Sequence, residues 1–230
     1  MTDFFENSVF FGVLLTLISY GIGIVIKKKL KLAIFNPLLI AIIITISVLL
    51  IFHIDYQKYN EGSKYITYLL TPATICLAVP LYEQLELLKK NYKAVFIGIA
   101  SGVLTSLCSI LLFALLFGFD HSTFVAILPK SITTAIGIGI TEELGGCISL
   151  TVAVIIITGI FGNMIAEIVC KLFKITDPIA KGVAIGTSSH AMGTAKAIQI
   201  GEIEGAVSSL SIVVSGILTV VGASIFAQFL

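Results

Sequence analysis

The chain contains several apolar runs that carry no charged residue and are long enough to cross a lipid bilayer. The hydrocarbon core of a bilayer is about 30 Å thick and is spanned by about 20 residues of helix. Inside lipid every backbone polar group must be bonded internally, so runs of this kind are predicted to be helices. The predicted spans are Asn7 to Ile26, Leu32 to Phe52, Tyr65 to Tyr82, Ala94 to Phe119, Cys147 to Ala166 and Ala206 to Leu230.

The composition supports an all-α polytopic membrane protein with a single integral membrane domain over residues 1–230. Hydrophobic residues make up 57% of the chain and charged residues only 12%, whereas soluble domains have about 25% charged residues. The net charge of +1 gives no reason to expect nucleic-acid binding. We find no paired metal ligands, phosphate-binding loop or GxSxG sequence, so we expect neither an enzyme nor a cofactor or metal.

Two predicted helices are interrupted. The stretch Gly182 to Lys196, GVAIGTSSHAMGTAK, is rich in glycine and hydroxyl groups and lies between apolar runs. Its freed backbone groups cannot face lipid, so it is expected to be buried or to line a wet cavity, as substrate sites of transporters do. The run from Tyr65 to Tyr82 contains Pro72 and Pro80, and proline breaks or kinks a helix.

A third irregular segment, Ser122 to Thr141, contains Pro129-Lys130 and several hydroxyl groups, and Glu142 and Glu143 follow it. We predict that it re-enters the membrane without crossing, because this topology separates the lysines best. With the N-terminus outside, only Lys58 and Lys64 face out, whereas a full crossing would divide the lysines seven against five. The favoured topology has about seven transmembrane helices and a cytoplasmic C-terminus. It places ten lysines in the cytoplasm: Lys27, Lys28, Lys29, Lys31, Lys89, Lys90, Lys93, Lys171, Lys174 and Lys181.

The sequence also indicates an internal repeat. A shift of 114 residues places Ser101–Thr105 on Ser215–Thr219 with four of five positions matching. It also superimposes the two interrupted segments, which predicts a three-plus-three inverted repeat with halves at about 32–119 and 146–230. Secondary transporters are often built this way. Chance similarity between apolar helices is the alternative.

Three motifs resemble the LrgB/CidB family. They are TPATICLAVPLYEQ at 71–84, LPKSITTAIGIGITEELGG at 128–146 and GTSSHAMGTAKA at 186–197, although Gly137 and Gly139 loosen the second motif. The resemblance implies a protein of the bacterial cytoplasmic (inner) membrane with a small holin-like partner of the LrgA/CidA type. The family includes antiholin-like proteins described as regulators of murein hydrolase export. It also includes a plastid carrier of glycolate and glycerate, and bacterial pairs linked to pyruvate uptake.

The candidate site residues suit a small organic anion. All 14 basic residues are lysine, so an anion must be held by lysine, hydroxyl groups, backbone N–H groups or histidine. Lys130 is the expected cation, unless it extends toward the interface. His190 is either a substrate donor or proton carrier, or a packing residue. The predicted substrate-binding residues are His190, Lys130, Ser188, Ser189, Thr194, Thr74, Ser131 and Thr133. The predicted coupling or gating residues are Glu142, Glu143, Pro72, Pro80, Gly186 and Gly193.

These features predict a membrane transporter of small carboxylates of the pyruvate, glycolate or glycerate class, acting with the holin-like partner. The alternative is an antiholin-like regulator of murein hydrolase activity and cell lysis. We also expect a homodimer, because few helices would otherwise support the moving part.

Overall fold

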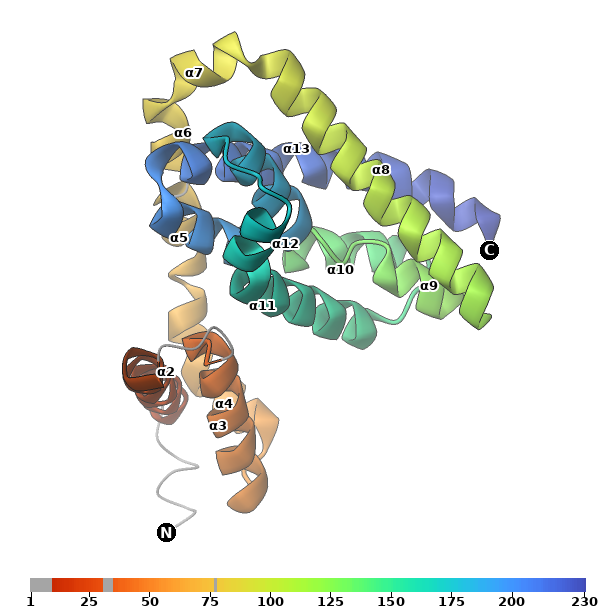
Figure 1. Cartoon of the computed structure of the whole chain (residues 1–230). Helices are drawn as coiled ribbons and strands as arrows, with labels where there is room; N and C mark the ends of the chain where they lie inside the picture. Colours follow the sequence, from red (N-terminus) through yellow and green to blue (C-terminus); the bar gives the residue numbers. More distant parts are fainter. Residues whose placement is uncertain (1–9, 31–34, 77) are drawn as a thin grey trace. The chain divides into compact units, whose positions relative to one another are not determined.

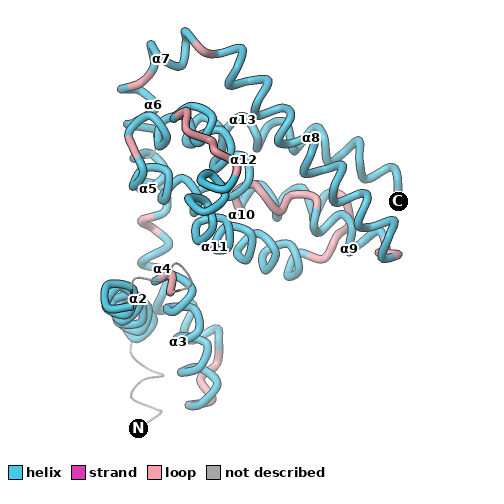
Figure 2. The backbone as a smooth tube through the Cα atoms, viewed as in Figure 1, coloured by secondary structure: helices cyan, strands magenta, loops and turns pink. Residues whose placement is uncertain are grey.

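The computed structural model describes residues 10–30, 35–76 and 78–230 (Figure 1). Over these ranges the chain consists of helices joined by short loops and turns, with no strand (Figure 2). The chain divides into two compact units, Met1–Cys76 and Leu77–Leu230, and each is described by itself.

The first unit contains α2 (Phe11–Leu30), α3 (Pro37–Ile51), α4 (Tyr56–Thr67) and α5 (Leu70–Cys76). Helix α2 packs against α3 and α4, and Gly23 allows this because its missing side chain would meet the backbone of Pro37. The polar stretch 53–64 is mostly helical. Its helix α4 begins after Asp55, whose side chain accepts a hydrogen bond from the Gln57 N–H at 2.6 Å, as a favourable N-cap does.

The second unit contains the remaining helices and its own apolar core. A row of buried side chains on α8, spaced one turn apart from Val95 to Ala114, packs with Phe124, Val125 and Ala223. Helix α12 packs against α8, α11 and α13. The elements are α6 (Ala78–Glu83), α7 (Leu85–Lys90), α8 (Tyr92–Phe117), α9 (His121–Ile127), α10 (Thr134–Glu143), α11 (Ile148–Leu172), α12 (Pro178–Ile200), α13 (Glu202–Phe226) and a 3-10 turn (Ala227–Phe229).

Four helical segments of the described chain are long and apolar enough to cross a membrane. They are Phe11–Leu30, Tyr92–Phe117, Ile148–Leu172 and Glu202–Phe229, and the apolar helix Pro37–Ile51 is shorter. The predicted span 65–82 is not one helix, because α4 ends at Thr67 and α5 begins at Leu70. Pro72 lies in the first turn of α5, where a helix tolerates proline.

Helices α9 and α10 form a hairpin. At its base the imidazole Nε2 of His121 lies 3.2 Å from the carbonyl oxygen of Leu144. Thr151 Oγ1 donates to the carbonyl of Ala126 at 3.0 Å and is 2.8 Å from Thr141 Oγ1, so it bonds to both arms. The chain reverses over the turn that contains Lys130. This fold-back is the geometry expected of a re-entrant segment, whereas its depth in a membrane stays a prediction.

Helix α12 also turns back on itself, at His190, whose φ of 42° and ψ of −142° are not helical. A Cβ placed on Gly193 would lie 3.0 Å from the carbonyl oxygen of Ile185. Eight residues of straight helix would separate these positions by about 12 Å. Ile185 and Ala197 also share one buried cluster. Segment 182–200 was expected to cross the membrane, but its two halves return to the same end.

The predicted seven crossings and three-plus-three inverted repeat are therefore not confirmed. The second unit instead contains a long helix followed by a hairpin, twice in succession: α8 with α9 and α10, then α11 with the two halves of α12. One end of this unit carries lysines together with Glu167, Asp177, Glu202 and Glu204, and the other carries acidic residues without a lysine and Leu230, whose carbonyl oxygen lies 2.8 Å from His121 Nδ1. The lysines at the lysine end are Lys93, Lys171, Lys174, Lys181 and Lys196, and the acidic residues at the other end are Asp120, Glu142 and Glu143.

Glycines on α11 accommodate the α12 hairpin, and this contact can be tested. A Cβ on Gly162 would overlap Ser189, and one on Gly159 would lie 2.6 Å from Nε2 of His190. We expect Gly162→Ala to lower the free energy of unfolding by about 1–3 kcal/mol, the usual cost of overpacking. Thermal unfolding of the purified protein in detergent measures the change.

The matched control is Gly139→Ala in α10, where an added Cβ would meet nothing within 4 Å. Removing a glycine from an exposed helix position is expected to be neutral or to stabilise by about 0.5–1 kcal/mol. Equal losses in both variants would contradict the proposed packing.

Candidate functional site

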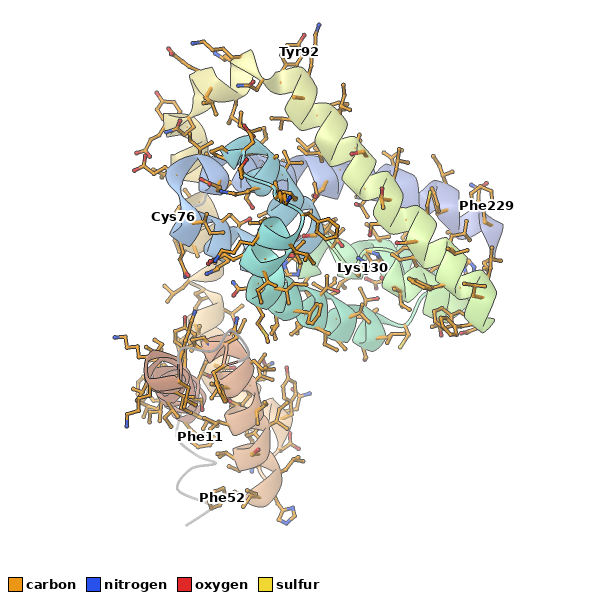
Figure 3. All side chains as sticks on the ribbon, in the orientation of Figure 1. Phe11, Phe52, Cys76, Tyr92, Lys130 and Phe229 are labelled. Carbon is orange, nitrogen blue, oxygen red and sulfur yellow. The ribbon has the colours of Figure 1, made fainter. Side chains whose placement is uncertain are left out.

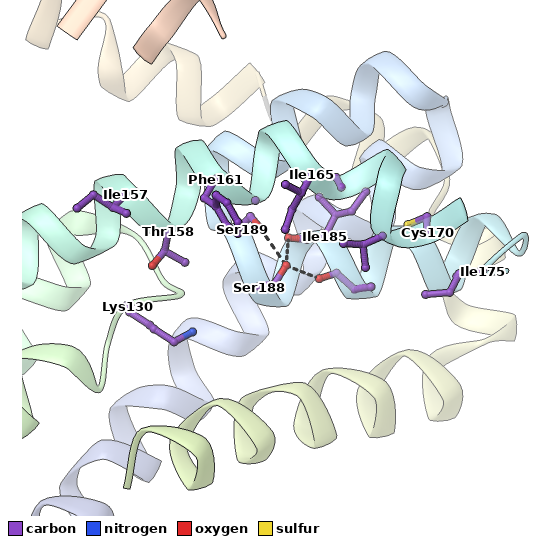
Figure 4. A pocket seen from close by; sticks show the side chains of 14 residues that line it. Lys130, Ile157, Thr158, Phe161, Ile165, Cys170, Ile175, Ile185, Ser188 and Ser189 are labelled. Atoms are coloured by element: carbon purple, nitrogen blue, oxygen red, sulfur yellow. Dashed lines mark hydrogen bonds between the residues drawn. The ribbon is translucent and has the colours of Figure 1, made fainter. Parts of the chain in front are cut away.

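The turns of the two hairpins meet around Lys130 and Ser188. Both residues line two cavities, one lined mainly by residues with hydroxyl groups, called the polar cavity below, and one mostly apolar. Lys130 belongs to the α9–α10 turn, and Ser188 comes two residues before the break of α12. In Figure 4 the Lys130 side chain extends toward the segment that carries Ser188 and Ser189. The fold thus joins two segments that are distant in sequence into one candidate site.

The polar cavity has a volume of about 320 Å³ and is lined largely by hydroxyl groups. Ser101, Thr105 and Ser109 follow one another at four-residue spacing and therefore lie on one face of α8. Gly102 allows α8 to approach α12 closely, because a Cβ there would lie 3.1 Å from Thr187 Oγ1. The lining residues are Ser101, Gly102, Thr105, Ser106, Ser109, Lys130, Ser131, Thr187 and Ser188.

Lys130 is a cation without a carboxylate partner within the described ranges. Figure 3 shows it well inside the second unit, far from the labelled Tyr92 and Phe229 at its ends. Its Nζ donates to Ser131 Oγ at 2.9 Å, which leaves further N–H donors of the ammonium group for a ligand. Glu142 and Glu143, the predicted coupling residues, do not pair with it. Both carboxylates are exposed at the far end of α10, about 15 Å along that helix from its start.

Two hydroxyl groups beside Lys130 can also donate to an anion. Ser131 Oγ accepts from the ammonium group, so its own hydrogen remains available. Ser106 Oγ is buried and has no hydrogen-bond partner among the described residues, which is unusual and calls for a ligand or water. The other hydroxyls bond to their own helices; Ser188, for example, donates to the carbonyl of Ala184 at 2.7 Å.

The apolar cavity lies between α11 and the first half of α12 and has a volume of about 460 Å³. Ile157, Phe161 and Ile185 contribute to its walls, while Lys130 and Ser188 form part of its polar edge (Figure 4). Lys130 therefore has a polar chamber on one side and an apolar chamber on the other.

A further cavity, of about 410 Å³, adjoins this region, and its lining includes Asp177 at the lysine end of the unit. It runs between α8 and the first half of α12 and is lined by small residues such as Ala94, Gly98 and Ala180. It shares Gly102 and Thr187 with the polar cavity. These shared residues make it a candidate route to Lys130.

His190 contributes to the packing of the hairpin. Its ring is buried, and its Nε2 lies 3.0 Å from the carbonyl oxygen of Ile155. The backbone groups freed at the break are bonded as well: Thr194 Oγ1 donates to the carbonyl of His190 at 3.1 Å. Asn163 donates to the carbonyl of Met192 at 2.7 Å. This geometry matches the packing alternative for His190, and the cavities around Lys130 are lined by other residues.

The other predicted residues fall into three groups. Ser131, Ser188 and Ser189 line the cavities at Lys130, and Thr133 precedes α10 in the same turn. Thr194, Gly186 and Gly193 are buried in contacts of α12, where Thr194 Oγ1 lies 2.7 Å from Ser208 Oγ. Pro72 belongs to the first unit, and the side chains of Thr74 and Pro80 lie outside the described residues.

Sequence reasoning missed the contribution of α8. Ser101, Thr105, Ser106 and Ser109 lie in a segment that was predicted to be an ordinary span, and Thr187 of the interrupted segment was not among the predicted substrate-binding residues. The four-residue spacing of the hydroxyl groups on α8 was the available signal.

Comparisons with known proteins agree over nearly the whole chain. The LrgB-like family matches residues 16–229. The chain is 36% identical over 222 residues to the antiholin-like protein LrgB of Bacillus cereus (strain B4264), covering 96% of both chains. The antiholin-like protein LrgB of Bacillus anthracis (strain CDC 684 / NRRL 3495) is equally similar. No solved structure matches the chain.

The strained backbone of His190 generates a prediction. Because its φ is positive, glycine tolerates this position better than alanine does. We expect His190→Ala to destabilise the protein by about 1–3 kcal/mol through the lost buried hydrogen bond. His190→Gly should cost less than His190→Ala, although glycine is normally the poorer helix residue. Thermal unfolding of both variants checks this order, and a lower midpoint for the glycine variant would contradict it.

Proposed function

The chain belongs to the LrgB-like family, and we propose that it is a membrane carrier of small carboxylates that are bound at Lys130. One observation carries this proposal. Lys130 has no carboxylate partner within the described ranges and lies where two hairpin turns meet beside a cavity lined by hydroxyl groups. Transporters commonly place their substrate sites between interrupted helices.

The donors around Lys130 suit a carboxylate. Such a group accepts several hydrogen bonds through two oxygens, and Lys130, Ser131 and Ser106 supply a charge and two hydroxyl donors. The charge offsets the cost of removing the anion from water, which hydroxyl groups alone would not do. A cavity of about 320 Å³ is at the low end of the range for ligand sites, as expected for a small acid.

The glycine-lined route between α8 and α12 provides access in this mechanism. Gly98 and Gly102 let α8 contact Val183 and Thr187 without intervening bulk. Packed helices can slide by small amounts along such a surface. We propose that the α12 hairpin moves relative to α8, and that this motion exposes Lys130 first to one side of the membrane and then to the other.

The distribution of charge suggests an orientation for the second unit. Cytoplasmic ends of membrane helices are rich in lysine, so we place the end with Lys171 and Lys181 in the cytoplasm of a bacterial inner membrane. Leu230 then lies on the opposite side, because it contacts His121 at the acidic end. This placement replaces the predicted cytoplasmic C-terminus, which assumed that 182–200 crosses the membrane.

A second candidate function is regulation of cell lysis. It is favoured by the name of the relatives, which are antiholin-like proteins. In this proposal the chain binds a holin-like membrane protein of the LrgA/CidA type and modulates its pore, and through it murein hydrolase activity. The partner and a homodimeric state are compatible with either function, because a carrier can also act in such a complex.

We expect Lys130→Gln to weaken saturable carboxylate uptake strongly, by raising the substrate concentration needed for half-maximal uptake. Loss of a charge-assisted hydrogen bond costs about 1.5–3 kcal/mol, which corresponds to a roughly 10- to 100-fold loss in affinity. Uptake of labelled pyruvate, glycolate and glycerate into proteoliposomes, with and without a proton gradient, measures this effect. The experiment is run with and without the holin-like partner.

Two controls distinguish an effect of the lost Lys130 charge from an effect of impaired folding. Lys89→Gln removes an exposed lysine that lines none of the cavities at Lys130, and should leave uptake unchanged. Thermal unfolding shows whether Lys130→Gln remains folded. Wild-type rates in the folded Lys130→Gln protein, or no uptake by the folded wild type with its partner, would refute the carrier proposal.

The regulatory function makes a different prediction. If the chain acts only by contacting a holin-like pore, its effect on lysis needs the partner but not the charge of Lys130. Lysis is followed by the optical density of cells that express the partner with the wild type or with Lys130→Gln. Equal protection by both proteins, together with absent uptake, would support regulation over transport.

A further inference from the structure

A separate cavity lies at the lysine end of the second unit. It has a volume of about 760 Å³ and is formed where α11 ends and where both halves of α12 return. Lys171, Lys174 and Lys181 line it together with Glu167 and Gln199. It shares only Cys170 and Ile175 with the apolar cavity at Lys130, and it shares no residue with the polar one.

The lysines at this cavity outnumber the carboxylates. Glu167 pairs with Lys196 and lies 4.0 Å from Lys171. The buried Glu204 lies 3.5 Å from Lys181. Among the residues that line the cavity, three lysines thus face one carboxylate, Glu167, and Lys174 has no ion pair within the part of the chain that is described. The cavity is therefore positively charged.

Lys174 occupies a position that normally favours glycine. Its φ is 55°. The N–H of Ile175 bonds to the carbonyl of Cys170 at 2.8 Å, and that of Lys174 bonds to Lys171 at 3.2 Å. This is the Schellman pattern, in which the left-handed residue after the helix is usually glycine. The lysine side chain is therefore not needed for the turn itself, and its contribution is a charge at the cavity.

Exposed apolar side chains next to these lysines indicate the level of the membrane surface. Leu172 and Phe173 are 73% and 70% exposed and lie between Lys171 and Lys174 in sequence. Helix α11, which ends there, is one of the helices apolar enough to span a membrane. Apolar groups at such a helix end contact lipid chains, while lysines extend to the headgroups. A free anion in water would gain nothing from this apolar rim.

We propose that this cavity binds the phosphate of an anionic phospholipid headgroup, with Lys171 and Lys174 as its exposed cations. The glycerol and upper acyl region of the lipid would contact Ile175 and the neighbouring apolar surface. This site is independent of the proposed carboxylate site, since it uses different charged residues and does not require transport.

The test measures lipid binding by native mass spectrometry of the delipidated protein. Phosphatidylglycerol, phosphatidylcholine and water-soluble glycerol phosphate are titrated separately, at low and high ionic strength. The variant is Lys171→Gln combined with Lys174→Gly, which leaves Glu167 paired with Lys196 and installs the residue preferred in the turn. Lys89→Gln is the control, because it removes a lysine that does not line the cavity.

We expect saturable binding of phosphatidylglycerol that weakens with salt, and much weaker binding of phosphatidylcholine. Each lysine near an anionic headgroup contributes about fivefold in affinity, so the double variant should bind up to roughly thirty-fold more weakly. Its thermal midpoint without lipid should not fall, and Lys89→Gln should bind like the wild type.

Three results would overturn the proposal. One is wild-type affinity for phosphatidylglycerol in the double variant. Another is equal affinity of the wild type for phosphatidylcholine. The third is glycerol phosphate binding as tightly as the lipid, which would assign the cavity to a soluble anion. A lower thermal midpoint in the single variant Lys174→Gly would show that the Lys174 side chain stabilises the turn, and would refute the inference that it contributes only its charge.

Discussion

Every backbone group that is freed where α12 breaks must find a partner inside the protein, because lipid offers none. The side chains around the break supply these partners: Thr194 and Asn163 bond to carbonyl groups of the turn, and His190 bonds to Ile155 on α11. The hairpin can form only because Gly159 and Gly162 leave room for His190 and Ser189. The candidate site depends on this arrangement, since the hairpin places Ser188 at the cavities around Lys130.

Contacts between small residues shape the rest of the second unit. Gly182 and Gly186 lie against Val207 and Ser208 of α13, whereas Gly98 and Gly102 lie against α12 from the other side. Such close backbone approach is a common way to pack helices in membranes, where burial of apolar surface gives little driving force between helices. The small side chains also leave a cavity between α8 and α12. The same residues thus allow the helices to pack closely and provide the proposed route to Lys130.

The lysines of the second unit lie in three kinds of environment: paired with a carboxylate, bonded to a hydroxyl group, or exposed next to apolar side chains. Lys181 and Lys196 are held by Glu204 and Glu167 and fix the ends of α12 to α13 and α11. Lys130 bonds only to a hydroxyl group within the described chain, which keeps its charge available for a ligand. Lys171 and Lys174 are exposed next to apolar side chains, where a membrane surface would be. The functions proposed for these lysines thus include structural, ligand-binding and interfacial ones, in a chain whose basic residues are all lysine.

The sequence by itself determined the helical class, four of the apolar spans, the family and the irregular character of the segments around Lys130 and His190. These properties depend on local composition: apolar length predicts a helix, and glycine, proline and hydroxyl groups predict interruption. Tertiary structure alone decided that α12 returns instead of crossing, because a straight interrupted helix and a hairpin have the same local pattern. It also decided that His190 packs against Ile155 and that α8 contributes hydroxyl groups to the site. Those outcomes depend on which helix faces which, and periodicity within one helix cannot specify its neighbour.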